Sequence, residues 1–97
     1  MRLDLFLKLS RLVPRRTLAQ QMCEAGAVRL NGSPAKSAHP VHCGDEIVIR
    51  QRGRLSTIRV LDVPEKQVSK SVALSLYEIT GVESYDAEVV SFGADPE

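Results

Sequence analysis

The sequence is poor in aromatic residues and in cysteine, and it has no long hydrophobic run. Aromatic residues make up 4% of the 97 residues, so a surface that stacks successive bases on aromatic rings is disfavoured. The two cysteines, Cys23 and Cys43, are too few for a disulfide framework and are expected to be reduced thiols. No apolar run approaches the roughly 20 residues needed to span a bilayer, and Asp4 and Lys8 interrupt the start where a signal peptide would be apolar. These features predict a cytoplasmic protein with no membrane partner.

Motifs for catalysis and for metal binding are also missing. The segment HPVHC brings His39, His42 and Cys43 together, but a zinc site usually takes four ligands in two spaced pairs. Asp45 and Glu46 are adjacent, so in a strand they point to opposite faces and cannot work as an acid and base pair. Neither GxxxxGK[ST] nor GxGxxG occurs. The sequence therefore predicts a protein that is not an enzyme, with no metal, no cofactor and no small-molecule substrate.

The net charge of +1 hides a strong division along the chain. Through Val60, 11 basic residues oppose four acidic ones, whereas from Leu61 onward eight acidic residues oppose two basic ones. A basic body favours a nucleic-acid partner. Two other interpretations remain open: the charges only solvate a surface, or the basic and acidic halves pair between subunits of a protein-interaction module.

Two helices are predicted near the N-terminus. The segment LDLFLKLSRLV is apolar around most of a helix, with an exposed polar strip of Asp4, Lys8 and Arg11, and Pro14 should end this helix at Val13. A second helix is expected from about residue 16 to 25, stopped by a glycine. Arg15 and Arg16 lie at its start, where the positive end of the macrodipole makes a cation cost roughly 0.3 to 1 kcal/mol.

The pattern then changes to that of a small antiparallel sheet. Strands are expected at residues 28–30, at EIVIRQ (46–51) and from about residue 55 until Pro64, with turns at Asn31-Gly32 and at residues 52–54. A short helix is expected at about 68–80, followed after Gly81 by an acidic tail without a clear period, frayed or disordered. The fold class is therefore α+β, with two N-terminal helices packed on a small antiparallel sheet. We expect a domain over residues 1–63 and a C-terminal extension over 64–97.

Basic residues are expected to gather where the two helices meet. Guanidinium groups bind phosphate oxygens through paired hydrogen bonds, and the N-terminus of the second helix adds backbone N–H groups. Such a surface reads the nucleic-acid backbone and its shape rather than base sequence. The candidate RNA-binding residues are Arg2, Lys8, Arg11, Arg15 and Arg16, with Arg29 and Lys36 extending the surface along the hairpin.

The first 60 or so residues resemble the RNA-binding domain first recognised in small-subunit ribosomal protein four, the S4 domain. The resemblance rests on many fixed spacings: Arg2-Leu3-Asp4, Phe6-Leu7, Ser10-Arg11, Arg15-Arg16-Thr17, Ala19, Gly26, Val28, Asn31-Gly32, Ala35-Lys36 and Gly44-Asp45-Glu46-Ile47. It implies the same fold as the pattern analysis. It also implies that Arg2 and Arg16 grip the rRNA backbone and that Lys8, Arg11, Arg15 and Lys36 lie on the same face.

Within that family, the free-standing length and the stretches MRLDLFLKLSRLVPRRTLA and ALSLYEITG resemble the small S4 proteins of bacterial ribosome-associated quality control. The resemblance implies binding to a stalled large ribosomal subunit, with contacts to rRNA and to the P-site peptidyl-tRNA. It also implies support for the NEMF-type protein RqcH, which adds an alanine tail to the stalled chain. The chain is similar as well to the small heat-shock S4 proteins, although their extension is long and basic. An accessory RNA-binding module for an RNA-modifying enzyme is a further alternative.

Overall fold

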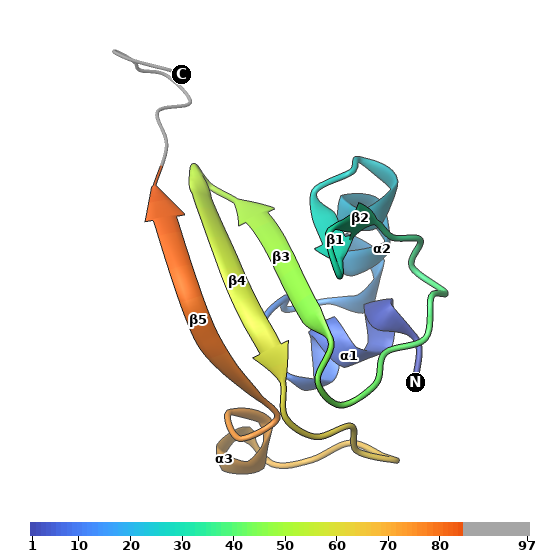
Figure 1. The fold of residues 1–97 in the computed structure, drawn as a ribbon. Coiled ribbons are helices and arrows are strands. Elements are labelled where there is room, and N and C mark those ends of the chain that lie inside the picture. The colour runs from blue at the N-terminus through green and yellow to red at the C-terminus, as the bar shows by residue number, and fades with distance from the viewer. Residues whose placement is uncertain (85–97) are drawn as a thin grey trace.

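The computed structural model describes residues 1–84, which form two helices packed against one five-stranded antiparallel sheet with the strand order β2-β1-β3-β4-β5. Figure 1 shows α1 and α2 together behind the sheet, and α3 where β4 leads into β5. This architecture confirms the predicted α+β class. The elements are α1 (Leu3–Leu9), α2 (Arg16–Glu24), β1 (Val28–Leu30), β2 (Ser33–Pro34), β3 (Glu46–Gln51), β4 (Arg54–Val60), α3 (Lys70–Ala73) and β5 (Tyr77–Ser84).

The core lies between the two helices and the central strands. Burial alternates along β1 and β3, and the register places Val28 opposite Ile49 and Leu30 opposite Ile47. Burying one such aliphatic side chain contributes about 1.5 to 3 kcal/mol, so this row fixes which face of the sheet the helices cover. The buried cluster includes Leu3, Phe6, Leu7, Val13, Ala19, Met22, Val28, Leu30, Ile47, Ile49, Ile58, Val60 and Leu76.

The first helix is shorter than predicted. It ends at Leu9 rather than at Val13, and Arg11 follows with a φ of 64°, a left-handed conformation that stops the helix. Val13 instead donates its N–H to the carbonyl of Leu7 at 3.1 Å and is fully buried. Because Pro14 disfavours a helical backbone at Val13, the chain turns early and returns Val13 to the core.

Both predicted hairpin turns are present. Asn31 and Gly32 have φ values of 52° and 86°, and Arg52 and Gly53 have φ values of 51° and 74°. Positive φ at both central residues matches the right-handed twist of the flanking strands. The fourth strand, however, ends at Val60 instead of continuing to Pro64, because the N–H groups of Leu61 and Asp62 both donate to the carbonyl of Leu76, at 2.8 and 3.2 Å.

The prediction of a helix over residues 68–80 is wrong. Only Lys70–Ala73 is helical, begun by Ser69, whose side chain accepts from the N–H of Val72, and β5 starts at Tyr77. β5 pairs with β4 from one end of the strand to the other. This tertiary pairing overrides the helix-like spacing of the apolar residues in this segment. A register shift between Thr57 and Ile58 leaves Thr80 as the extra residue of β5, because Thr57 pairs with Gly81 and Ile58 pairs with Ile79.

The last strand also changes the interpretation of the C-terminal part. Residues 81–84, expected to begin the tail, belong to β5, which completes the same sheet as residues 28–60. The remainder of the expected acidic tail lies outside the described residues. The domain division after residue 63 stays a prediction.

Candidate nucleic-acid interface

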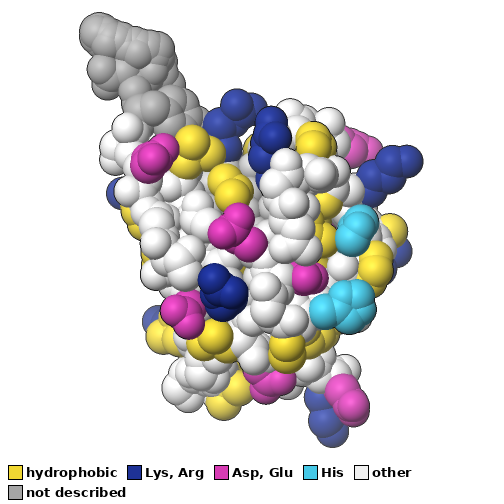
Figure 2. Space-filling model, viewed as in Figure 1, with side chains coloured by type: hydrophobic (Ala, Val, Ile, Leu, Met, Phe, Trp, Pro, Cys, Tyr) yellow, Lys and Arg dark blue, Asp and Glu magenta, His cyan; other side chains and the backbone are white. Residues whose placement is uncertain are grey.

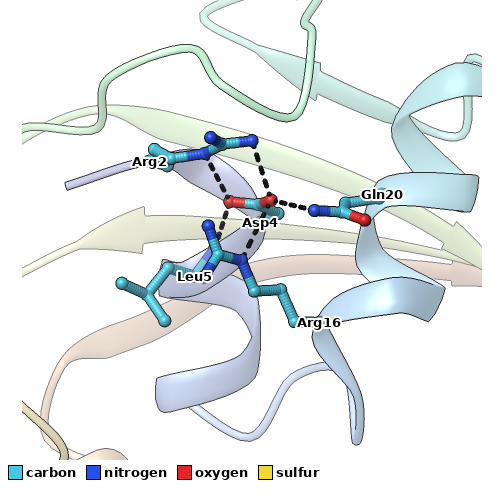
Figure 3. Close-up of polar contacts among 5 residues, drawn as sticks. All are labelled: Arg2, Asp4, Leu5, Arg16 and Gln20. Atoms are coloured by element: carbon cyan, nitrogen blue, oxygen red, sulfur yellow. Dashed lines mark hydrogen bonds and ion pairs between the residues drawn. The ribbon is translucent and has the colours of Figure 1, made fainter.

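A fully buried carboxylate, that of Asp4 on α1, joins the two arginines that the sequence singled out (Figure 3). Arg2 donates from Nε to Oδ1 at 3.2 Å and from Nη2 to Oδ2 at 3.3 Å, and Arg16 donates from Nε to Oδ2 at 3.2 Å. Gln20, one turn along α2, donates from Nε2 to Oδ2 at 2.8 Å, and the N–H of Leu5 donates to Oδ1 at 2.7 Å. One carboxylate thus fixes side chains from both helices.

Asp4 was predicted to lie in the exposed strip of the first helix, and this was wrong. Burial by itself raises the pKa of Asp4, but the hydrogen bonds from Gln20, Arg16 and the Leu5 N–H, with the charge of Arg16, hold the pKa below its ordinary value. The carboxylate therefore stays ionised. The sequence did carry a signal for this site, since Asp4 is the only acidic residue in the mostly apolar segment 3–13.

The buried carboxylate also accounts for the cations at the start of α2. Arg15 is the N-cap residue and makes no side-chain capping hydrogen bond, and the first turn holds no acidic residue. Asp4 supplies from α1 the negative charge that an acidic residue in that turn would supply. The cost predicted from the sequence alone is therefore partly offset at Arg16.

Both arginines of this cluster remain half-exposed. The side chains of Arg2 and Arg16 are 47% and 42% accessible, while Asp4 is inaccessible. Arg16 uses only Nε on Asp4, so within residues 1–84 its two terminal nitrogens have no protein partner. Two cations around one carboxylate leave a net positive site whose outer N–H groups face solvent.

Lys8 and Arg11 lie on a different part of the helical side. Together with Val13, Pro14 and Val68, they line a hollow of about 280 Å³ between the end of α1 and the segment before α3. Arg15 is exposed at the start of α2. These three cations flank the connection between the helices, as predicted, but none of them joins the Asp4 cluster.

Lys36 lies near the start of α1. It lines a hollow with Cys23, Glu24 and Ser37. The carbonyl of Ser37 accepts from the N–H of Asp4 at 3.1 Å, so the segment that carries Lys36 runs beside the first turn of α1. Lys36 can therefore extend a basic surface from the Arg2 side.

Arg29 is placed apart from the other candidates. Its neighbours Val28 and Leu30 are buried in the core, and alternation along β1 turns Arg29 to the outer face of the sheet. Figure 2, viewed like Figure 1, shows basic and acidic side chains interspersed over this side of the molecule. In the register, Arg59 lies between Glu46 and Glu78, which gives this face mixed charge.

The described part of the chain shows neither a candidate metal site nor a helix that could span a membrane. Among residues 1–84, no group of three or more His, Cys, Asp or Glu side chains could hold a metal ion. No helix in that range is both long and apolar enough to cross a bilayer. Cys23 is buried and Cys43 exposed, both as free thiols, and burial, with the nearby charge of Asp4, raises the pKa of Cys23.

Two helices at a basic corner, packed on a small antiparallel sheet, define an S4-domain protein, and the S4 domain family model matches residues 1–47. The chain is 49% identical over 79 residues to the RQC P-site tRNA stabilizing factor of Halalkalibacterium halodurans, covering 81% of this chain and 89% of that protein. It is 40% identical over 79 residues to the factor of the same name from Bacillus subtilis, covering 81% of this chain and 91% of that protein. The chain belongs to this family of RQC P-site tRNA stabilizing factors.

The fold has a close relative among solved structures. The trimeric structure of heat shock protein 15 from Vibrio cholerae superposes with a TM-score of 0.77 at 34% sequence identity, over 82% of this chain and 81% of that one. The predicted resemblance to both subgroups of small S4 proteins is thus confirmed at the level of sequence and fold.

Proposed function

We propose that this protein binds stalled large ribosomal subunits, where it contacts rRNA and the P-site peptidyl-tRNA. The observation that carries the proposal is the Arg2–Arg16 pair, which a buried carboxylate holds half-exposed with donors directed to solvent. The names of the relatives, which refer to P-site tRNA, support the same assignment. The residues assigned to RNA are Arg2, Lys8, Arg11, Arg15, Arg16, Arg29 and Lys36.

The chemistry of the cluster suits a phosphodiester backbone. An RNA phosphate at Arg16 would meet the two terminal guanidinium nitrogens and the unpaired N–H groups of the first turn of α2. Because Asp4 already fixes the guanidinium of Arg16, less side-chain entropy is lost on binding. Contacts of this kind recognise the position and shape of an RNA backbone rather than its sequence.

The proposed role is that of a non-catalytic factor acting in the cytoplasm with RqcH. By holding the P-site tRNA on the subunit, the protein would support the addition of an alanine tail to the stalled nascent chain. Contacts to rRNA and tRNA require positioning only, and the candidate residues are all arginines or lysines suited to bind phosphate.

Sucrose-gradient sedimentation of the tagged protein from cells tests this proposal. The protein should migrate with free large subunits that carry tRNA, and its removal should shorten or abolish alanine tails on a reporter that stalls translation. A tagged protein found only at the top of the gradient would contradict the proposal, as would tails that are unchanged without it.

The structural likeness to heat shock protein 15 supports a second candidate, a factor that binds stalled large subunits without RqcH. Both candidates predict sedimentation with large subunits. Co-purification separates them, because the first requires that RqcH occupy the same particles and that alanine tailing depend on the protein. Particles that hold the protein and peptidyl-tRNA but never RqcH would favour the second.

A further inference from the structure

Two hairpin turns of the same shape use different residues at the same strained position. Asn31-Gly32 and Arg52-Gly53 have closely similar φ values, 52° and 86° against 51° and 74°. Asparagine tolerates the left-handed conformation because its short polar side chain can form a local hydrogen bond. The long side chain of arginine does not reduce the strain in this way. Arg52 is therefore a poor residue for its turn, and such an outlier points to a role outside folding.

Arg52 lies at the edge of a hollow on the helical side of the sheet. The hollow has a volume of about 450 Å³ and lies between the β3–β4 turn and the connection that joins α1 to α2. Ser56 pairs with Ile49, a core residue, so its side chain points to this side of β4. The lining consists of Leu12, Pro14, Gln51, Arg52, Arg54 and Ser56.

The two arginines of the hollow differ from those of the Asp4 cluster. Within residues 1–84, neither Arg52 nor Arg54 forms an ion pair, since the ion pairs there involve Arg2, Arg16 and His42. Gln51 donates from Nε2 to the sulfur of Met22 at 3.9 Å, which leaves its carbonyl oxygen available as an acceptor. The hollow thus offers two guanidinium groups, an amide, a hydroxyl and an apolar wall.

We infer that this hollow is a second RNA contact, which takes an unpaired nucleotide. The guanidinium groups of Arg52 and Arg54 bind its phosphate, and the base lies against Pro14 and Leu12 with its edge toward Gln51 and Ser56. Four of the lining residues come after residue 47, beyond the part of the chain that the S4 domain model matches. The inference rests on the proposal that the chain binds RNA and adds a contact to it.

Continuity with the other cations favours RNA as the ligand. Pro14 lines both this hollow and the one that contains Lys8 and Arg11. Two pairs of cations, Lys8 with Arg11 and Arg52 with Arg54, therefore lie on either side of Pro14. An RNA strand could follow this path around the connection between α1 and α2. A chain of evenly spaced phosphates matches such a path better than a single anion does.

The test uses two fluorescein-labelled RNAs, a blunt stem–loop and the same stem–loop with an unpaired 3′ extension. The wild-type chain should bind the extended RNA more tightly. Arg52→Asn and Arg54→Gln should each weaken that binding about tenfold, as expected for one charge-assisted contact, and lower the salt slope by about 0.7. Arg52→Asn should at the same time raise the Tm by a few degrees, because asparagine suits the turn.

Arg59→Gln is the matched control, because it removes one arginine from β4 on the outer face, between Glu46 and Glu78. Equal losses in Arg59→Gln and Arg54→Gln would overturn the inference, as would a wild-type chain that binds both RNAs equally. If Arg16→Ala weakens binding while Arg52→Asn does not, only the second contact fails. If the wild-type chain binds neither RNA nor large subunits, the proposed function fails as well.

A final experiment distinguishes RNA from an acidic polypeptide as the ligand of the hollow. Arg54 pairs with Ser84, so the described part of the chain ends beside this hollow, and further acidic residues follow in the sequence. A chain ended at Ser84 should show the same preference for the extended RNA. If shortening instead raises the affinity for both RNAs and Arg52→Asn removes that gain, the hollow belongs to the acidic segment and the inference is wrong.

Discussion

The Nε atom of Arg16 lies 3.2 Å from Oδ2 of Asp4, which joins the first turn of α2 to the first turn of α1 through a carboxylate with no accessible surface. Arg2 holds the other side of the same group. The contact makes Asp4 a residue of the fold and of the binding surface together. Changes at Asp4 and at Arg16 should therefore separate stability from RNA binding.

Asp4→Ala should destabilise the protein by about 2 kcal/mol. The change removes a buried acceptor of hydrogen bonds from Arg2, Arg16 and Gln20, although both arginines can still reach water. Urea denaturation followed by circular dichroism measures the loss. Asp4→Asn keeps the side-chain volume and one acceptor oxygen but removes the charge, so a neutral result for Asp4→Asn would mean that the charge of the carboxylate contributes little to stability.

Stability should fall in acid by a component that belongs to Asp4. Its pKa is lowered in the folded state from an ordinary value of 3.8, so folding favours the ionised carboxylate. The contribution is fully present above that value and is lost as the pH falls through 3.8 toward the folded pKa. Urea midpoints of wild type and Asp4→Asn should therefore converge in acid, and a constant gap across this range would contradict the assignment.

The sequence predicted those elements whose signals are local. Asn31-Gly32 fixes a turn, and Gly26 ends α2 one residue after its C-cap. The segment from Tyr77 was misread because its apolar spacing fits a helix, while the pairing with β4 that decides its conformation is invisible in the sequence. Asp4 was misplaced for the same reason, since its partners Arg16 and Gln20 come from another helix.

Leu76 should matter far more than Leu74, two residues earlier. Leu76, immediately before β5, is 1% exposed, whereas Leu74 is 57% exposed. Leu76→Ala should cost about 2 to 4 kcal/mol, because it leaves a cavity in the core, and Leu74→Ala should cost less than about 0.5 kcal/mol. The free energy of unfolding from urea titrations measures both. Similar losses in the two variants would contradict the end of the helix and the start of the strand assigned to this segment.

Arg16→Ala should weaken binding to purified large ribosomal subunits while the chain stays folded. Asp4 keeps hydrogen bonds from Arg2 and Gln20 in this variant, so its carboxylate is not left without partners. The loss should be about tenfold or more, with a salt slope reduced by about 0.7 to 0.9 for the phosphate contact removed. Filter binding at several salt concentrations measures both quantities.

Arg16→Lys provides the matched comparison, because it keeps the charge and removes the planar fork. If the terminal nitrogens of Arg16 grip a phosphate in the paired geometry that Asp4 imposes, lysine should recover the salt slope but only part of the affinity. Full recovery by lysine would mean that charge alone is needed at this position. Unchanged binding by Arg16→Ala would instead show that the RNA lies on another face of the molecule, which would contradict the role assigned to the Asp4 cluster.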